Sequence, residues 1–289
     1  MRTSLTIGSL RAIADLDPHF DEWELVDLAG WYGRPSILHD AEPIPGQHGF
    51  LPPTEVTYAG RYVYVTLRKR VQPHQDIRSH HWGEFSDIRI GVPYSMTVED
   101  AAGALTTDVW LTEAPDFVID TVEWWATVTL PLMAPDPRKY GPARPLRISA
   151  TPETTNGLEF PLFEDGFLSF GPFDTGAGFG AGSFALHNHG SIESYPIYRV
   201  TGAIAGGFSI LTDGGELKFA QTVPPGTELV LSPYAGGRAV LNGVDVTVSL
   251  TVADWVPVAR GERRGFTFVP VGTASAGAEL AVDFREAWI

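Results

Sequence analysis

Hydrophobic and polar residues alternate along much of the first half of the chain. Segment 55–70 (EVTYAGRYVYVTLRKR) shows this most clearly, with Tyr62, Tyr64 and Thr66 on one face of an extended chain and Val63, Val65 and Leu67 on the other. A two-residue period built from aromatic and β-branched side chains is typical of a strand. Ala59-Gly60 predicts a turn before this strand. Segments 104–113 and 123–132 repeat the pattern, so the sequence predicts an N-terminal β domain.

Two prolines end this first series of strands. Pro135 and Pro137 follow the run WWATVTLPLMA. They cannot donate ladder hydrogen bonds and their fixed φ makes a stiff connection. A second series of strand patterns begins just beyond them. The sequence therefore predicts two β domains, residues 1–140 and 141–289, joined near residues 134–145.

The second half reads as about ten short strands separated by turn residues. The runs are LRISA, GFLSF, GSFALHNHG, YPIYRVTGAI, FSILTD, ELKFAQTV, TELVLSP, RAVLNGVDVTVSL, RRGFTFVPV and AELAVDFREAWI. Asn242-Gly243 predicts a two-residue hairpin within one of them. Closely spaced short strands favour a β-sandwich of jelly-roll type. The fold class expected is all-β with minor α, the helix candidates being residues 17–25 and 83–91.

The net charge, the absence of cysteine and the lack of long apolar stretches argue against several classes of function. The 289 residues carry 35 Asp and Glu against 20 Lys and Arg, a net charge of −15. Such a chain should repel nucleic acid, because affinity for phosphates comes from basic side chains. The absence of cysteine excludes disulfides, thiolate metal sites and a cysteine nucleophile. No apolar stretch has the length of a signal peptide core or a membrane span, so we expect a soluble protein made in the cytoplasm.

His187-Asn188-His189 is the sharpest candidate for metal chemistry. Two histidines at i and i+2 of a strand share a face and could bind one zinc or copper ion. A turn in which Asn188 and Gly190 supply unusual backbone angles is the simpler interpretation. The pair His80-His81 within 79–84 (SHHWGE) points in opposite directions along an extended chain and favours an exposed loop.

The other motifs favour structure over catalysis. Glycines at 176, 178, 180 and 182 lack the spacing of a dinucleotide fingerprint and predict a loop. No nucleophile elbow, zinc-protease helix or phosphate loop occurs. Trp31, Tyr32 and Trp82 could stack on sugars, whereas Trp124 and Trp125 lie in a strand pattern. We therefore predict no catalytic, cofactor-binding or metal-binding residues, no cofactor and no enzymatic activity.

Several segments, in order, resemble the distal tail proteins of long-tailed bacteriophages. They are GRPSILHDAEPIPGQHGFLPPTEVTYAGRYVYVTLRK, WWATVTLPLMAPDPRKYG, HNHGSIESYPIYRVTG, RAVLNGVDVT, a later DW and the closing VDFREAWI. The resemblance covers nearly the whole chain. VARGERRGFTF lacks the proline that the family usually has at the corresponding hairpin, and residues 72–94 have no counterpart in the pattern.

The resemblance implies an N-terminal β domain that forms a ring, commonly hexameric, and a C-terminal galectin-like sandwich. It also implies a structural role at the virion tail tip. The ring would join the tail tube protein to the hub, carry receptor-binding or fibre proteins, and let DNA pass through its channel without specific binding or any membrane contact. An acidic channel would repel the passing duplex.

Two alternatives remain beside this interpretation. A carbohydrate-binding sandwich protein that contacts host cell-wall sugars would be a monomer with an aromatic groove. A cupin-like metalloenzyme would use His187 and His189. At the junction, Arg138 and Lys139 could pair with acids of a neighbouring subunit or lie solvated. Tyr195, Pro196 and Trp288 are expected to pack within the second sandwich.

Overall fold

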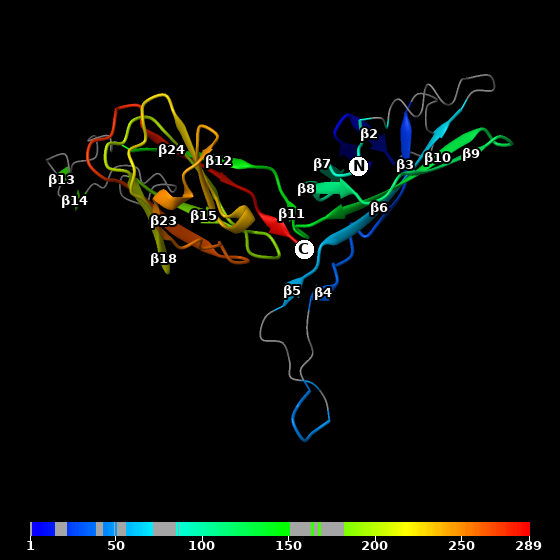
Figure 1. The fold of residues 1–289 in the computed structure, drawn as a ribbon, viewed down its shortest axis with the longest axis horizontal. Helices are drawn as coiled ribbons and strands as arrows, with labels where there is room; N and C mark the ends of the chain where they lie inside the picture. The colour runs from blue at the N-terminus through cyan, green and yellow to red at the C-terminus, as the bar shows by residue number, and fades with distance from the viewer. Residues whose placement is uncertain are drawn as a thin grey trace. The chain divides into compact units, whose positions relative to one another are not determined.

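The chain of the computed structural model divides into two units, each with its own hydrophobic core (Figure 1). Unit 1 is residues 1–142 with 288–289, and unit 2 is residues 143–287. The structure describes residues 2–14, 22–38, 43–48, 50, 56–71, 85, 87–150, 163–164, 167–168 and 182–289. The described elements are strands and two short 3₁₀ turns, as an all-β class requires.

Unit 1 is built on one sheet that closes on itself. Its strand order is β25-β11-β8-β7-β1-β2-β3-β6-β10-β9, and a further pairing of β10 with β8 closes a barrel. Only β2 and β3 pair in parallel among the register pairs described for it. The strands are β1 Ser4–Ile7, β2 Leu10–Ile13, β3 Trp23–Ala29, β6 Arg61–Arg70, β7 Pro93–Asp100, β8 Gly103–Leu111, β9 Asp116–Asp120, β10 Trp125–Ala134, β11 Lys139–Tyr140 and β25 Ala287–Trp288.

The two-residue period sets the inside of this barrel. Val63, Val65 and Leu67 of β6 are fully buried, whereas Tyr62 and Tyr64 face outward, as the pattern predicted. Strand β10 ends at Ala134, directly before the first of the two junction prolines. Its internal Pro131 pairs with Tyr64 on one side. On the other side Pro131 falls between the last residue paired with β9 and the first paired with β8, so its missing N–H costs no ladder bond.

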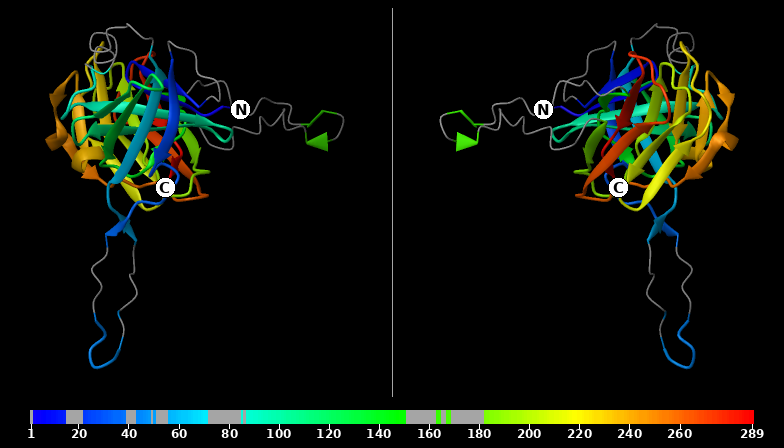
Figure 2. Two further views of the ribbon diagram at one scale, coloured as in Figure 1. Left: turned by 90° about the vertical axis from the view of Figure 1, so that its right-hand side faces the viewer. Right: turned by 90° about the vertical axis from the view of Figure 1, so that its left-hand side faces the viewer.

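A separate two-stranded ribbon leaves unit 1 between β3 and β6. It pairs β4 Ile37–Leu38 with β5 Thr57–Tyr58, and Pro43 forms a bridge to Phe50 farther along. The views agree that this ribbon stands away from the barrel (Figures 1 and 2). We call β4, β5 and the described residues 43–48, 50 and 56 the arm.

Unit 2 is a sandwich of two antiparallel sheets, as expected. The six-stranded sheet has the order β12-β24-β16-β19-β20-β21 and the five-stranded sheet β15-β23-β17-β18-β22. The strands are β12 Arg144–Ser149, β15 Ser183–His187, β16 Ile197–Thr201, β17 Phe208–Thr212, β18 Gly215–Phe219, β19 Glu228–Ser232, β20 Arg238–Leu241, β21 Val244–Asp245, β22 Leu250–Ala253, β23 Arg263–Pro270 and β24 Glu279–Phe284.

Smaller elements complete unit 2. They are the hairpin of β13 Phe163–Glu164 with β14 Phe167–Leu168 and the 3₁₀ turns Tyr234–Gly236 and Thr247–Ser249. Asn242 and Gly243 both have positive φ, 45° and 84°, between β20 and β21. The predicted two-residue hairpin is therefore confirmed, since such turns need positive φ at both central residues.

One expectation about local structure was wrong. The first helix candidate, residues 17–25, contributes Trp23–Leu25 to strand β3, because pairing with β2 and β6 overrides its weak helical pattern. In the second, residues 83–91, the described Phe85 is helical and its carbonyl accepts from the Ile88 N–H at 3.0 Å, whereas Ile90 forms a bridge with Leu111 and Gly91 takes positive φ. No helix in the described part of the chain is long and apolar enough to cross a membrane.

Candidate functional site

The two histidines of the HNH motif lie together on one face. The ring centroids of His187 and His189 are 3.7 Å apart, and His189 Nδ1 lies 2.5 Å from the Glu286 carboxylate. Arg144 Nη1 is 3.3 Å from the same carboxylate oxygen. Among the described residues no group of three His, Cys, Asp or Glu could hold a metal ion. The pair therefore lies beside the ion pair of Glu286 with Arg144.

Asn188 between them fixes the turn through its side chain. It is fully buried, its amide donates to the carbonyls of Ile192 and Val258 at 2.8 and 3.0 Å, and Gly190 N–H donates to its oxygen. Neither Asn188 nor Gly190 has positive φ, contrary to the expectation of unusual backbone angles. Glycine is needed at 190 because a Cβ there would lie 1.9 Å from the carbonyl oxygen of Ala287.

Two other motifs lie mostly outside the described residues. They are the histidine pair within 79–84 with Trp82, and the glycine series, of which only Gly182 is described. Gly182 has φ +85° and approaches the Phe268 carbonyl closely, which explains a glycine at that position without reference to any ligand.

The aromatic residues proposed for sugar stacking have different positions. Trp31 is 1% exposed, so the expectation of an exposed Trp31 was wrong. Tyr32 is exposed and its hydroxyl donates to Asp100 at 3.1 Å. Trp125, which was predicted to lie in a strand, begins β10 and lies beneath the guanidinium of Arg68, whose carbon is 4.7 Å from the ring centroid. Its burial removes Trp31 from any surface groove.

Trp31 is buried because two cations cover it. Lys139 is 6% exposed; its ammonium donates to the Trp31 carbonyl at 3.1 Å and lies 5.3 Å from the ring centroid. The expectation that Lys139 is solvated or pairs across subunits was therefore wrong. Its neighbour Arg138 has a guanidinium nitrogen 3.7 Å from Asp136, within the same unit.

The second cation, Arg61, was missed by the sequence analysis. It is 1% exposed at the start of β6 and donates to the carbonyls of Gly30, Trp31, Gly33 and Pro137 at 2.5–3.1 Å. Burial lowers the pKa of Arg61. Burial and then the charge of Arg61 lower the pKa of Lys139 from 10.5 to about 8. Arg61 thus ties the base of the arm to the junction after β10.

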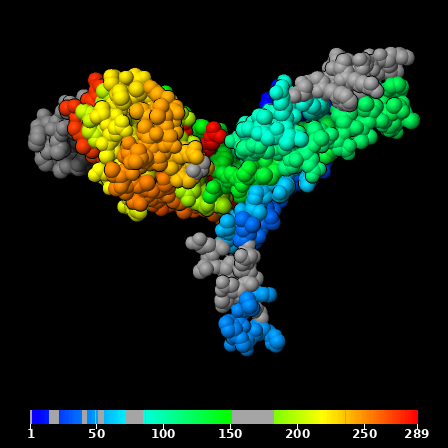
Figure 3. All heavy atoms as spheres, in the orientation of Figure 1, coloured from blue at the N-terminus to red at the C-terminus, as the bar shows by residue number. Residues whose placement is uncertain are grey.

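The arm beyond that base exposes large apolar side chains. Ile37, Leu38, Phe50 and Val56 are 55%, 60%, 63% and 48% exposed. A two-stranded ribbon has little stability of its own in water, and contiguous exposed apolar side chains mark interaction surfaces. The space-filling view shows the arm as a narrow projection from unit 1 (Figure 3). We take the arm as the candidate assembly surface.

The outer face of β6 carries a second group of exposed side chains. Tyr62 and Tyr64 are 58% and 49% exposed, and Val118 on β9, two strands away, is 57% exposed. Thr66 and Thr129 pair across β6 and β10, with hydroxyls 3.4 Å apart. The outer face therefore carries aromatic, β-branched and threonine side chains, which suit contact with another protein surface.

No family model matches the sequence, and no curated protein matches it. Solved structures do match along the whole chain. The crystal structure of the Dit protein of phage SPP1, described as a paradigm of the hub adsorption apparatus in phages that infect Gram-positive bacteria, superposes with a TM-score of 0.64 at 15% identity, covering 99% of both chains. The fold is that of a phage Dit protein.

Structures of the phage p2 baseplate in its activated conformation match the same fold. A chain of the strontium form gives a TM-score of 0.52 at 7% identity, covering 100% of this chain and 99% of that one. A chain of the calcium form gives 0.51 at 7% identity, with 99% and 97% covered. The Dit-like fold thus includes both units and extends over the full length of the compared chains.

Proposed function

We propose that this protein is a non-enzymatic structural component of a phage virion, a distal tail protein at the tail tip that is assembled in the host cytoplasm. The observation that carries the proposal is the full-length match to the Dit structure, which covers both units in one superposition. A match to unit 2 alone would support only a sandwich module of open function.

In this role unit 1 forms a homo-oligomeric ring, with six copies as the family resemblance implies. The exposed apolar side chains of the arm support an assembled state, because a second copy would remove them from water. The ring joins the tail tube protein to the tail-tip hub, and unit 2 offers an attachment platform for receptor-binding or fibre proteins. The net charge of −15 suits a channel through which DNA passes without binding.

The solution mass of the purified chain, with negative-stain images of the same fraction, tests the ring. We expect rings with an open centre, formed by the chain alone or when it is co-expressed with the tube and hub proteins of its phage. A chain that stays monomeric in both preparations, and that antibodies do not detect at the tail tip of purified particles, would overturn the proposal. A monomer would favour the alternative of a stand-alone carbohydrate-binding protein.

A pair of variants tests the arm as the assembly surface. Leu38→Lys adds a charge to the arm, and Val244→Lys adds one to a comparably exposed site of unit 2, 60% against 64% exposed. We expect Leu38→Lys to abolish ring formation and Val244→Lys to leave it intact. Equal behaviour of the two variants would assign the interface elsewhere.

A further inference from the structure

Four side chains form a row across the outer face of the barrel of unit 1. Met133 of β10 pairs with Tyr62 of β6 on one side and with Trp110 of β8 on the other. Trp110 pairs in turn with Pro93 of β7. In each strand the two-residue alternation points these side chains away from the core. The row therefore crosses the seam at which β10 and β8 close the barrel.

A second pair of side chains lies beside this row. Tyr64 follows Tyr62 on the same face of β6 and pairs with Pro131 of β10. Tyr62 and Tyr64 are 58% and 49% exposed. A Cβ at Gly60 would lie 3.4 Å from the Met133 sulfur, so glycine at that position leaves room beside the thioether. We call this continuous outer surface the belt: Tyr62, Tyr64, Pro93, Trp110, Pro131 and Met133.

The belt carries no charged side chain, and the same holds for the described residues of the arm. Lys, Arg, Asp and Glu make up 19% of the chain, yet none is among them. Burying a charge without a partner costs free energy, so two uncharged surfaces can meet at lower cost. Ile37, Leu38 and Phe50 of the arm are 55%, 60% and 63% exposed, and the views show the arm standing away from its own barrel (Figures 1 and 2). The arm therefore has apolar area that its own unit does not cover.

The base of the arm is fixed in direction. Arg61 donates to the carbonyls of Gly30 and Gly33 on the chain that leads into the arm, and it is 1% exposed. A segment held in one orientation loses less conformational freedom when it binds. A closed ring of identical copies needs two different surfaces on each copy, one fitting the other. The arm and the belt are two such surfaces on the same unit.

We propose that the arm of one copy lies on the belt of the next copy around the ring. This inference rests on the proposed function and identifies the surface that receives the arm. Leu38 and Phe50 of the arm pack against the tyrosine rings of the belt and against Met133, whose flexible thioether adapts to irregular apolar surfaces. Each copy thus gives one arm and receives another.

A single contact of this kind is small. Four large apolar side chains of the arm are exposed among its described residues, and they bury less than the roughly 800 Å² per partner of a stable complex. An isolated pair of copies is therefore weakly held. Each copy of a closed ring makes two such contacts, and the last contact forms within an assembly that already exists, which favours the ring over the pair.

Cysteine cross-linking tests the contact, because the chain has no cysteine of its own. The double variant Leu38→Cys/Met133→Cys places one thiol on the arm and one on the belt. It is treated with a short bis-maleimide, both alone and co-expressed with the tube and hub proteins. We expect denaturing gels to show a ladder of linked dimers, trimers and larger species, because every copy is joined to two neighbours. Either single variant has one thiol per chain and gives no species larger than a dimer.

A matched control keeps the number of thiols and moves the second one. Leu38→Cys/Val244→Cys has its second thiol on unit 2, at a site that is 64% exposed. It should give about tenfold less material above the dimer, because its thiols meet only in random encounters. Tyr64→Cys replaces Met133→Cys if the melting temperature of the latter falls, because the Tyr64 side chain lies outside the core.

Negative-stain images of the same samples separate this inference from the proposed function. Rings that give no ladder with either arm and belt pair, or no more ladder than the control, overturn the inference and leave the ring standing. Chains that form neither rings nor a ladder in both preparations overturn both. A ladder from the arm and belt pair that the control lacks establishes the contact.

Discussion

Replacing Arg61 with methionine is the sharpest test of how unit 1 is held together. Methionine has similar length and no charge, so the carbonyls of Gly30, Trp31, Gly33 and Pro137 lose their donor. These four acceptors belong to the base of the arm and to the junction after β10. The change should therefore loosen both segments while the barrel strands stay paired.

The expected loss of unfolding free energy follows from two opposing contributions, hydrogen bonding and the cost of burying the charge. Each hydrogen bond from a charged donor contributes roughly 1.5–3 kcal/mol, but burying the guanidinium costs several kcal/mol. Removing one partner of a buried charged network typically costs about 3–5 kcal/mol. Removing Arg61 also relieves its repulsion with Lys139, which places the expected loss of stability near the lower end of this range. We expect about 3 kcal/mol, or a fall of about 1 M in the urea midpoint.

Urea unfolding followed by tryptophan fluorescence measures the loss, and hydrogen exchange assigns it to unit 1. The control is Arg147→Met, because Arg147 is 72% exposed and its partner Glu279 is 34% exposed, and such a surface ion pair contributes about 0–1 kcal/mol. If Arg61→Met and Arg147→Met lose the same stability, the buried carbonyl network does not hold the arm base and the reasoning fails.

Three further predictions concern pH and packing. The pKa of Lys139 is about 8 in the folded chain, against an ordinary value of 10.5. Between these pH values the unfolded chain binds more protons, so the stability of the fold should rise with pH across that window. Lys139→Met should remove this rise in urea midpoints measured as a function of pH. Gly190→Ala forces a Cβ to 1.9 Å from the Ala287 carbonyl oxygen, and thermal melts should show unit 2 destabilised by about 2 kcal/mol or more. Gly226→Ala, at a turn where a Cβ meets no neighbouring atom, should cost less stability. Phe208→Ala deletes a fully buried ring and should cost about 3–5 kcal/mol by calorimetry, and a loss under 1 kcal/mol would contradict the packing described.

The sequence correctly predicted those structural features that depend on residues close together in the chain. The alternation in segment 62–67 correctly separated Tyr62, Tyr64 and Thr66 on one face of β6 from Val63, Val65 and Leu67 on the other, because a strand has a strict period of two. The pair Asn242-Gly243 correctly predicted a hairpin at that point of the chain, because few other residue pairs accept positive φ at both positions. These signals lie within a few residues, so a single sequence carries them.

The features missed depend on distant segments. Arg61 donates to Pro137, 76 residues away, and Lys139 donates to Trp31, 108 residues away. No local pattern distinguishes these buried cations from exposed ones, and basic residues are usually exposed. One local feature could have indicated that Arg61 and Lys139 are buried: each begins a strand just after a turn that contains glycine or proline.

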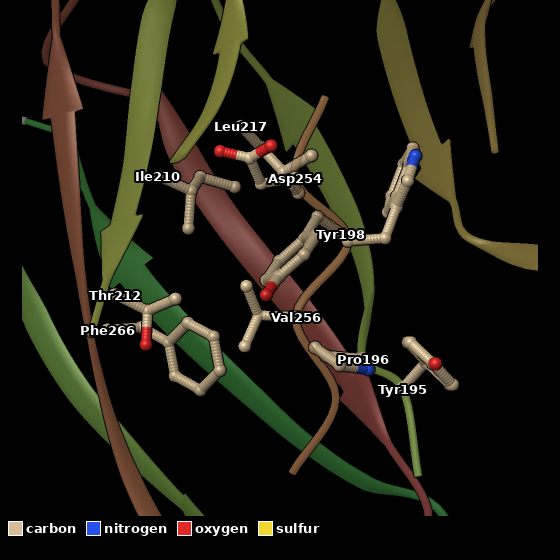
Figure 4. A pocket seen from close by; sticks show the side chains of 10 residues that line it. Tyr195, Pro196, Tyr198, Ile210, Thr212, Leu217, Asp254, Val256 and Phe266 are labelled. Atoms are coloured by element: carbon tan, nitrogen blue, oxygen red, sulfur yellow. The ribbon is translucent and has the colours of Figure 1, made fainter. Parts of the chain in front are cut away.

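A shallow hollow of unit 2 that Tyr198 and Asp254 help to line was missed for the same reason (Figure 4). The two residues lie 56 residues apart in the sequence, and the strand pattern around Tyr198 predicts only that one of its faces is buried. The hollow depends on the path of segment 254–256, which packs against Gly215 of β18 and against Gly237 just before β20.

The return of residues 288–289 to unit 1 bears on the order of events during synthesis. Strand β25 is the edge of the sheet next to β11, yet all of unit 2 is translated between these two strands. Domains generally fold as they leave the ribosome, the N-terminal one first. Here the N-terminal unit stays without its last edge strand until residues 287–288 have been synthesised. A nascent chain shorter than this therefore carries an open sheet edge beside β11, which β25 closes only after unit 2 has been made.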